Sequence, residues 1–288
     1  MKPHNVKTKI FLDGGDPGET REVVSVLGFL DGQTTNPTLI AKHPEAKKRM
    51  EQGKLFSTKE IFDFYKQVVG EISKEIPNGS VSVEVYADNN TSADAMFSQG
   101  KEMFSWIPNA HIKYPITKQG LAAAEKSIQE GMRVNMTLCF NQEQAAAVYA
   151  ATRGAKKGDV FVSPFVGRLD DRGENGMDLI HNILVMYEHG DGHAEVLAAS
   201  VRNMGHFMQS LALGADIITA PLSVLSEWGK AGMPMPQEGA VYDISGLQHI
   251  SYQEKNLKNV WTEFDITHEL TDKGIERFSS DWNALIEK

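Results

Sequence analysis

Apolar residues along the chain follow two alternating patterns. Short runs rich in β-branched and aromatic residues predict buried strands, and longer segments with apolar residues every three or four positions predict amphipathic helices. The predicted strands are 9–13, 32–36, 81–86, 111–117, 133–139, 159–166, 194–201 and 216–220. The predicted helices are 18–27, 58–73, 91–104, 118–131, 142–153, 176–188, 204–213 and 223–230. Residues 41–54 are charged and fit either a loop or a helix.

The order of these elements predicts one closed barrel. Strands that alternate with helices form parallel sheets, because each crossover helix returns the chain to the same end of the sheet. Such units, repeated along residues 1–232, match the size of an α/β (β/α)8 TIM barrel, which we expect to be catalytic. An open doubly wound sheet is the competing architecture, but the segment from Gly14 to Gly18 is not the phosphate turn that usually follows its first strand.

The remaining residues, 233–288, predict a C-terminal extension that packs on the barrel. The pattern is irregular to about residue 267, and Thr271 is then typical of a helix cap. The apolar face of the final helix would contain Ile275, Phe278 and Trp282. Such a tail covers one barrel end, acts as a flap near the active site or forms an oligomer contact, so a homo-oligomer stays open.

The amino-acid composition argues against some classes of binding partner and leaves others open. The 288 residues carry a net charge of -9, which argues against a nucleic-acid or anionic-membrane partner but leaves anionic small molecules open. No stretch approaches the roughly 18 apolar residues of a membrane helix. The single cysteine, Cys139, permits no internal disulfide, so we expect a reducing, cytoplasmic compartment. Its apolar surroundings favour a core position over a nucleophile.

Lys113 lies between Ile112 and Tyr114 in the fourth predicted strand. A lysine in such a run is either on the polar face of an edge strand or buried with a partner, because an isolated buried ammonium is costly. Burial lowers a lysine pKa and produces a neutral amine, which is a nucleophile toward ketones. The strand alone does not decide between these two interpretations.

Polar residues near the carboxyl ends of the other strands favour the second interpretation. They are Asp13, Thr34, Asn36, Glu84, Asn135, Thr137, Ser163, Arg168, Ser200 and Arg202. Each one alone has an ordinary explanation as a turn residue, a cap or a surface charge. Together they would surround one barrel mouth, where TIM barrels carry their active sites.

The chemistry that these groups predict is concrete. An amine that forms a Schiff base with a ketone needs acid–base help to lose water, and a carboxylate can move the protons while the iminium allows the C3–C4 bond to break. Two arginines on adjacent strands suit a phosphate or a similar dianion, because guanidinium groups form forked hydrogen bonds.

The chain resembles the transaldolases, in particular the small bacterial branch that includes the fructose-6-phosphate aldolases. The matching motifs are Leu30-Asp31-Gly32-Gln33-Thr34-Thr35-Asn36-Pro37-Thr38, Val83-Glu84-Val85, Ile112-Lys113-Tyr114-Pro115-Ile116-Thr117, Asn135-Met136-Thr137-Leu138, Ser163-Pro164-Phe165-Val166-Gly167-Arg168, Ala199-Ser200-Val201-Arg202-Asn203 and Leu270-Thr271-Asp272-Lys273-Gly274-Ile275. This resemblance implies a TIM barrel, no metal, no organic cofactor, phosphorylated sugar substrates and a place in pentose phosphate metabolism.

The resemblance also implies roles for single residues. Lys113 matches the Schiff-base lysine, and Asp13 matches the proton-transferring acid. Glu84 and Thr137 match the pair that holds the catalytic water. Asn36, Asn135 and Ser163 match groups that bind the dihydroxyacetone moiety, Arg168, Ser200 and Arg202 match the phosphate site, and Thr34 is a neighbour of that pocket.

Two positions bear on the reaction type. The aldolase subgroup usually has Gln at the position of Glu84 and Tyr at the position of Phe165, so this chain resembles the transferases at both. Gly14 departs from the small hydroxyl residue that often follows the first acid, and nearby Asp16 is a rival for the acid role. Residues 44–57 and about 236–266 look like insertions, which leaves a sulfonated sugar conceivable.

Two further interpretations are open. His189 and His193 flank Asp191 with a spacing that fits a metal site, but their Gly-rich loop precedes a strand, and we favour a solvated turn there. A non-catalytic sugar-phosphate-binding barrel is the rival from a different class, and a fructose-6-phosphate aldolase-like lyase is the nearer alternative. The rival barrel should lack the lysine and the water-holding pair that this chain has.

Overall fold

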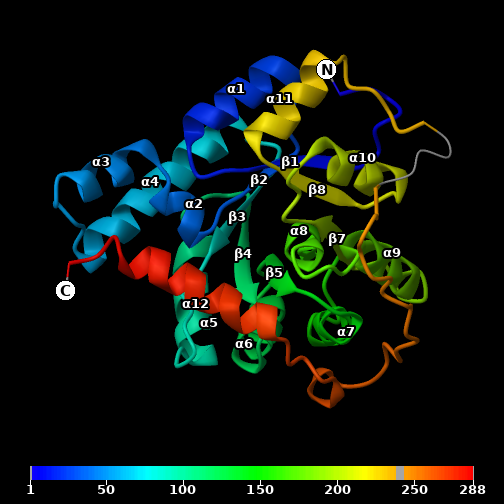
Figure 1. Ribbon diagram of the computed structural model, residues 1–288. Coiled ribbons are helices and arrows are strands. Elements are labelled where there is room, and N and C mark those ends of the chain that lie inside the picture. The colour runs from blue at the N-terminus through cyan, green and yellow to red at the C-terminus, as the bar shows by residue number, and fades with distance from the viewer. Residues whose placement is uncertain (1, 238–242, 288) are drawn as a thin grey trace.

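The computed structural model describes residues 2–237 and 243–287, and its centre is a closed barrel of parallel strands (Figure 1). The strands are β1 (Lys9–Asp13), β2 (Gly32–Thr34), β3 (Ser80–Glu84), β4 (Ala110–Pro115), β5 (Val134–Cys139), β6 (Val160–Pro164), β7 (Ala194–Ala198) and β8 (Ile217–Ala220). They pair in chain order, and β1 pairs with β8 in parallel. The predicted (β/α)8 barrel is confirmed, and the open sheet is excluded because this pairing leaves no edge.

Helices surround the barrel and lie between the strands in the chain. They are α1 (Pro17–Leu27), α2 (Pro37–Ala41), α3 (Pro44–Glu51), α4 (Thr58–Glu75), α5 (Ala93–Phe104), α6 (Lys118–Gln129), α7 (Gln142–Ala151), α8 (Val166–Asp170), α9 (Gly176–Tyr187), α10 (Met204–Ala212), α11 (Leu222–Lys230) and α12 (Glu269–Asn283), with a 3-10 turn η1 (Trp261–Glu263). Segment 41–54, for which the sequence left two options, is mostly the helix α3.

The strands β2, β3, β4, β6 and β7 end two or three residues earlier than predicted, and at β2 and β6 a helix that carries or is capped by a predicted site residue follows. β2 stops at Thr34, and the Asn36 side chain instead caps α2 by accepting a hydrogen bond from the Leu39 amide at 2.9 Å. β6 stops at Pro164, and the short helix α8 begins at once and carries Arg168. The strand pattern continued into both turns because their residues are also buried, so periodicity alone did not mark the ends.

The predicted cap of the last helix was also wrong. His268 caps α12, its Nδ1 accepting from the Leu270 amide at 3.2 Å. Thr271 points inward instead, where its hydroxyl donates to the Leu138 carbonyl at 3.0 Å and accepts from Gln144 at 2.7 Å. Thr271 therefore fixes α12 to the end of β5.

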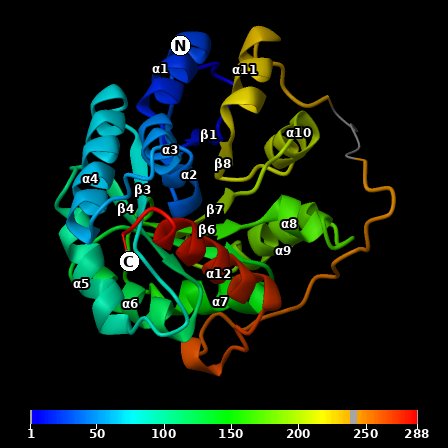
Figure 2. The ribbon, with the colours of Figure 1, turned by 60° about the vertical axis from the view of Figure 1, so that its left-hand side comes forward.

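The final helix lies across the barrel mouth (Figure 2). It contacts α2 and β5, and the Thr38 hydroxyl on α2 donates to Asp281. Trp282 packs edge-on against Phe62 and Tyr65 of α4, with ring centroids 5.8 Å apart in both pairs. The end of the chain thus covers the carboxyl ends of the strands.

The described parts of the chain between α11 and α12, 231–237 and 243–268, run along the outside of the barrel (Figure 1). The second part is held by α9, where Asn175 donates its amide to the Gln248 carbonyl and the Asn182 side chain donates to the Ile250 carbonyl, both at 2.8 Å. Residues 238–242 of the predicted irregular stretch lie outside the described residues. The division into 1–232 and 233–288 stays a prediction.

The barrel interior is layered from floor to mouth. At the floor, Lys9 donates to the Glu195 carboxylate at 2.9 and 3.0 Å. Above it, Phe161 meets Phe11 edge-on at 5.9 Å and stacks on His111 at 4.1 Å between ring centroids. The mouth layer is polar, so the alternation along each strand places polar side chains directly above an aromatic layer.

Candidate active site

Lys113 is buried inside the barrel. Its side chain is 4% exposed, and its Nζ lies 2.9 Å from Glu84 Oε2 and donates to the Thr35 carbonyl at 3.2 Å. The edge-strand interpretation is therefore wrong, because β4 lies between β3 and β5 in a closed sheet. A lysine in this position has one carboxylate partner and faces a cavity.

Strand register brings the partners of Lys113 together. Lys113 pairs with Glu84 on β3 and with Asn135 on β5, so all three residues lie at one level. Side chains at one level of adjacent parallel strands point the same way. The lysine, a carboxyl group and an amide therefore face the barrel axis as neighbours.

Glu84 is buried behind Lys113. Burial raises the pKa of Glu84, while the nearby Lys113 ammonium and, more weakly, Arg168 act in the opposite direction. The strand at this point is held by Tyr65, whose hydroxyl accepts from the Glu84 amide at 2.9 Å and bonds the Thr35 hydroxyl at 2.6 Å. A carboxyl group with a raised pKa beside an amine is suited to take up and return a proton.

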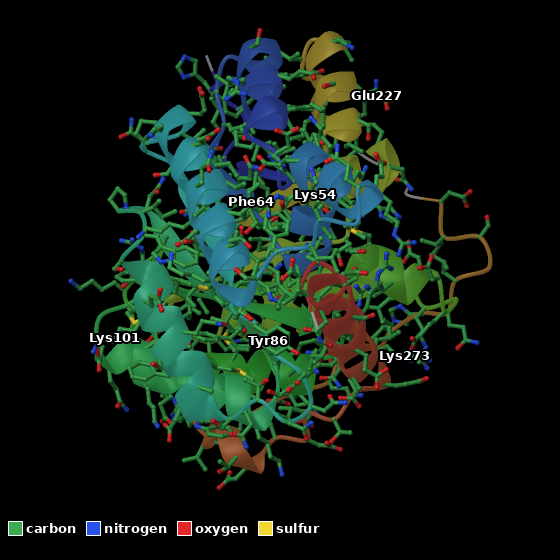
Figure 3. The ribbon with its side chains drawn as sticks, turned by 90° about the vertical axis from the view of Figure 1, so that its left-hand side faces the viewer. Lys54, Phe64, Tyr86, Lys101, Glu227 and Lys273 are labelled. Carbon is green, nitrogen blue, oxygen red and sulfur yellow. The ribbon has the colours of Figure 1, made fainter. Side chains whose placement is uncertain are left out.

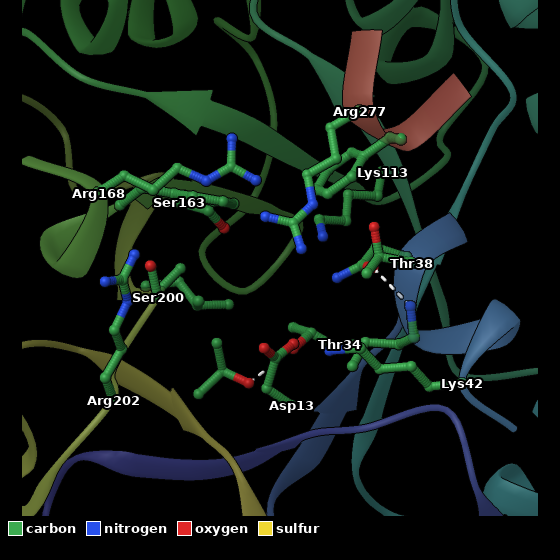
Figure 4. A pocket seen from close by; sticks show the side chains of 17 residues that line it. Asp13, Thr34, Thr38, Lys42, Lys113, Ser163, Arg168, Ser200, Arg202 and Arg277 are labelled. Carbon is green, nitrogen blue, oxygen red and sulfur yellow. Dashed lines mark hydrogen bonds between the residues drawn. The ribbon is translucent and has the colours of Figure 1, made fainter. Parts of the chain in front are cut away.

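Asp13 also faces the cavity, and Figure 4 shows it apart from Lys113. Burial raises the pKa of Asp13, and the Lys113 charge and a hydrogen bond from Thr34 work against that rise. The Thr34 hydroxyl lies 2.8 Å from Asp13 Oδ1 and 2.6 Å from the Thr219 hydroxyl. Asp16, the rival acid, instead caps α1 by accepting from the Gly18 amide at 2.7 Å.

A second polar chain lies between β3, β5 and β6. The Ser163 hydroxyl donates to Asn135 Oδ1 at 2.6 Å, and Asn135 Nδ2 donates to the Ser82 hydroxyl at 3.0 Å. All three side chains are buried. These bonds fix the direction of the Ser163 hydroxyl, which borders the cavity, while Asn135 lies behind it.

Thr137 is buried on β5, and its Oγ1 has no hydrogen-bond partner among the described residues. A buried hydroxyl without a partner costs free energy, so such an atom marks a place where another group binds. A crevice of about 10 Å³, close to the size of one water, is lined by Glu84 and by Leu138, the residue after Thr137. Thr137 itself does not line this crevice, so the paired role that the resemblance implies for Glu84 and Thr137 stays a prediction.

The cavity has a volume of about 190 Å³ and is the place where most predicted site residues meet (Figure 4). Those that line it are Asp13, Thr34, Asn36, Lys113, Ser163, Phe165, Arg168, Ser200 and Arg202. Glu84, Asn135 and Thr137 do not line it and lie around it as described above. Every predicted site residue thus belongs to one region of the barrel mouth.

One side of the cavity is cationic. Arg168 projects from α8 and lies over the rings of Phe165 and Phe278, at 5.2 and 5.5 Å. Arg202 follows β7 and pairs with Asp171 through both of its terminal nitrogens. Between them, Ser200 adopts a left-handed backbone with φ of 57°, an uncommon conformation for a residue with a side chain.

Sequence reasoning missed several lining residues, which are Thr38, Leu39, Lys42, Leu197, Ala199, Thr219, Arg277 and Phe278. Arg277 and Phe278 come from α12, for which the sequence left open a cover over one barrel end, a flap near the active site or an oligomer contact, without naming a residue that lines the site. Gly274 lets this helix approach closely, because a Cβ there would lie 2.6 Å from Leu138 and 2.8 Å from Arg168. An arginine beside Phe278, on a helix predicted to cover a barrel end, was the available signal.

The His-Gly-Asp-Gly-His run is not a solvated turn throughout. His193 is buried, and its ring bonds Asp191 at 2.5 Å and the Thr152 hydroxyl at 3.1 Å. Its Nδ1 partner Asp191 also accepts from the Tyr149 hydroxyl at 2.7 Å. Within 2–237 and 243–287, no group of three or more His, Cys, Asp or Glu side chains is placed to hold a metal ion.

Cys139 is buried, and burial raises its pKa to about 12, which agrees with the predicted core position. None of the helices in the described part of the chain is both long and apolar enough to cross a bilayer.

Comparison with known proteins decides the family. The sequence matches the family described as Transaldolase/Fructose-6-phosphate aldolase over residues 10–288. The chain belongs to this family. It is 35% identical over 274 residues to a probable transaldolase of Caulobacter vibrioides, covering 95% of this chain and 96% of that protein. It is 36% identical over 277 residues to a probable transaldolase of Dehalococcoides mccartyi, covering 96% and 99%.

Membership of the transaldolase/fructose-6-phosphate aldolase family confirms the resemblance drawn from the sequence motifs. The chain is therefore an enzyme of the transaldolase/aldolase class, a family that processes sugar phosphates.

Proposed function

We propose that the protein is a transaldolase that moves a dihydroxyacetone unit from a ketose phosphate to an aldose phosphate through a Schiff base on Lys113. The observation that carries this proposal is the buried Lys113–Glu84 pair, 2.9 Å apart, beside a cavity that also contains Asp13 and two arginines. The names of the bacterial relatives support the same activity.

The first steps use the buried pair. Lys113 transfers a proton to Glu84, and the neutral amine attacks the C2 carbonyl of the ketose. Glu84 returns the proton to the resulting hydroxyl group, which leaves as water and gives the iminium. Burial raises the pKa of Glu84 and so favours its protonated form during this exchange.

Asp13 acts next. Its carboxylate takes the proton from the C4 hydroxyl, the C3–C4 bond breaks, and its electrons move into the iminium to form an enamine. The aldose leaves, and an acceptor aldehyde is attacked by the enamine carbon while Asp13 returns the proton. Asn36, Asn135 and Ser163 are proposed to hold the three-carbon unit, and Arg168, Ser200 and Arg202 to bind the phosphate.

The direct test is reduction by borohydride in the presence of fructose 6-phosphate, followed by peptide mapping. We expect a stable adduct of ketose mass on the peptide that contains Lys113, and none in a Lys113→Met variant. An unmodified wild-type protein with every ketose phosphate tried would contradict the proposal and favour the non-catalytic barrel.

A transferase is favoured over a lyase by Glu84 and by Phe165, a buried ring at the cavity that carries no hydroxyl group. Without a phenol at 165, protonation of the enamine carbon is slow and the three-carbon unit waits for an acceptor. We expect dihydroxyacetone release from fructose 6-phosphate to be slow compared with transfer to erythrose 4-phosphate. Fast release without an acceptor would instead identify a fructose-6-phosphate aldolase-like lyase.

A further inference from the structure

Arg277 is a cation at the cavity to which neither the sequence motifs nor the comparisons give a role. It lies on α12, and its guanidinium points into the cavity toward the side where Arg168 lies (Figure 4). Its side chain is 62% exposed, and its carboxylate contact is a loose one of 3.9 Å with Asp281, one turn further along the same helix. The geometry leaves most of its hydrogen-bonding groups available to a ligand.

On the cationic side of the cavity, the arginine side chains outnumber the carboxylates that pair with them. Arg202 is paired with Asp171, whereas no carboxylate in 2–237 and 243–287 pairs with Arg168. Burial first, and then the charges of Arg277 and Arg202, together lower the pKa of Arg168 to about 10. Three neighbouring guanidiniums repel one another, so an anion bound among them is strongly favoured.

We propose that Arg277 binds the anionic end of the substrate together with Arg168 and Arg202, and that this third guanidinium makes the site selective for a phosphate monoester over a sulfonate. This inference rests on the proposed function and extends it to the choice of substrate. It also makes α12 a binding element of the site in addition to a cover over it.

The selectivity follows from charge. A phosphate monoester has a second pKa of about 6 and carries close to two negative charges at pH 7, whereas a sulfonate carries one. Each added guanidinium attracts the dianion about twice as strongly as the monoanion. A sulfonated sugar, which the sequence left conceivable, would gain little from a third arginine.

Lys273 provides a matched control on the same helix. It lies one turn before Arg277, is 62% exposed and pairs with Glu269, and Figure 3 labels it beside α12. Replacing either residue with Gln removes one positive charge from α12. Only the Arg277 change removes a group that lines the cavity.

The experiment measures kcat/KM with fructose 6-phosphate and with 6-deoxy-6-sulfofructose as donors, and with unphosphorylated glyceraldehyde as acceptor. We expect the wild type to prefer the phosphate by about tenfold or more. Arg277→Gln should lower kcat/KM for the phosphate donor by about tenfold and for the sulfonate donor by about threefold. Arg277→Lys should be intermediate, and Lys273→Gln should stay within about twofold for both donors.

Two results of this kinetic experiment would overturn the inference. One is an equal loss of kcat/KM in Arg277→Gln and Lys273→Gln, which would mean that Arg277 contributes only its positive charge to the electrostatic potential around α12. The other is a wild-type protein that uses the sulfonate donor as well as the phosphate donor.

A measurement without turnover separates this inference from the proposed function. Binding of inorganic phosphate at pH 8, followed by calorimetry, should weaken about tenfold in Arg277→Gln and remain unchanged in Lys273→Gln. If borohydride traps no adduct while phosphate binding changes in this way, the proposed function fails and the Arg277 assignment holds. If the adduct forms and phosphate binding is the same in all three proteins, the Arg277 assignment fails alone.

Discussion

The barrel contains two lysine–glutamate pairs, one at its floor and one at its mouth. At the floor, Lys9 is 38% exposed and contacts both Glu195 oxygens at 2.9 and 3.0 Å. At the mouth, both side chains of the Lys113–Glu84 pair are 4% exposed and a single contact of 2.9 Å joins them. The same two residue types thus form a partly solvated pair at one end and a buried pair facing a cavity at the other.

The difference teaches what turns an ion pair into a candidate catalytic pair. The Lys9 side chain reaches water, so its pair with Glu195 serves packing at the floor. The mouth pair is cut off from bulk water, and burial raises the pKa of Glu84. A pair whose proton can move, beside space for a substrate, is suited to covalent chemistry.

The largest expected effect separates the two lysines. Lys113→Met should lower transfer activity on the order of 10³-fold or more, because the nucleophile is lost. Lys9→Met should leave activity within about twofold and cost about 1–3 kcal/mol of stability, since Glu195 loses its partner. Steady-state assays measure the activity of both variants, and urea unfolding measures their stability. Comparable activity losses in the two variants would contradict the claim that only the mouth pair is catalytic.

The second effect separates the two glutamates. Glu84→Gln should lower turnover about 10²-fold, because an amide cannot accept the Lys113 proton. Glu195→Gln should change turnover less than about twofold, because Lys9 reaches solvent. The measurement is kcat for each variant with the same donor and acceptor. A Glu84→Gln enzyme with near-normal kcat would remove Glu84 from the proton-transfer steps.

The third effect is a shift in pH dependence at the mouth. The Thr34 hydrogen bond lowers the Asp13 pKa, which burial has raised, so Thr34→Val should raise that pKa further. Because the Asp13 carboxylate must accept a proton, the acidic limb of kcat/KM should move to higher pH. Thr34→Ser should keep the limb in place, and an identical limb in Thr34→Val would show that another group sets it.

The smallest effect on turnover is expected beneath the mouth, at His111. Burial lowers the His111 pKa to about 3, so the unfolded chain binds a proton below about pH 6.5 that the folded protein does not. Folded-state stability should therefore fall by about 1.4 kcal/mol per pH unit from this residue as the pH drops below that value.

His111→Leu should remove this slope and leave turnover within about twofold. Urea unfolding of the variant and the wild type between pH 5 and 8 measures the difference. Parallel stability curves would show that His111 does not remain neutral in the folded protein.

Much of this architecture was predictable from sequence because each strand carries local signals. Lys113 stands out between Ile112 and Tyr114, and the polar residues at neighbouring strand ends must converge once the sheet closes. The position of α12 was not predictable in this way. Its sequence shows an apolar face, but contacts such as that of Thr38 with Asp281, far apart in the chain, decide which surface it covers.

Other misses have local causes. Thr271 has a side chain typical of helix caps, but it is buried and donates to the Leu138 carbonyl. His268 therefore occupies the cap position of α12. Thr219 is a short hydroxyl in an apolar strand, and its partner Thr34 lies on a strand distant in the sequence. In such cases the hydrophobic pattern predicts the strand but not the hydrogen bond between side chains of two strands, such as that between Thr34 and Thr219.

The path of the chain has a consequence for biosynthesis. All eight strands of the barrel leave the ribosome before α12, so a nascent chain can close its sheet while the anion site still lacks Arg277 and Phe278. Catalytic competence would then lag behind folding by the time needed to translate the last segment. Shortened polypeptides ending after α11 should be folded but poor at capturing sugar phosphates.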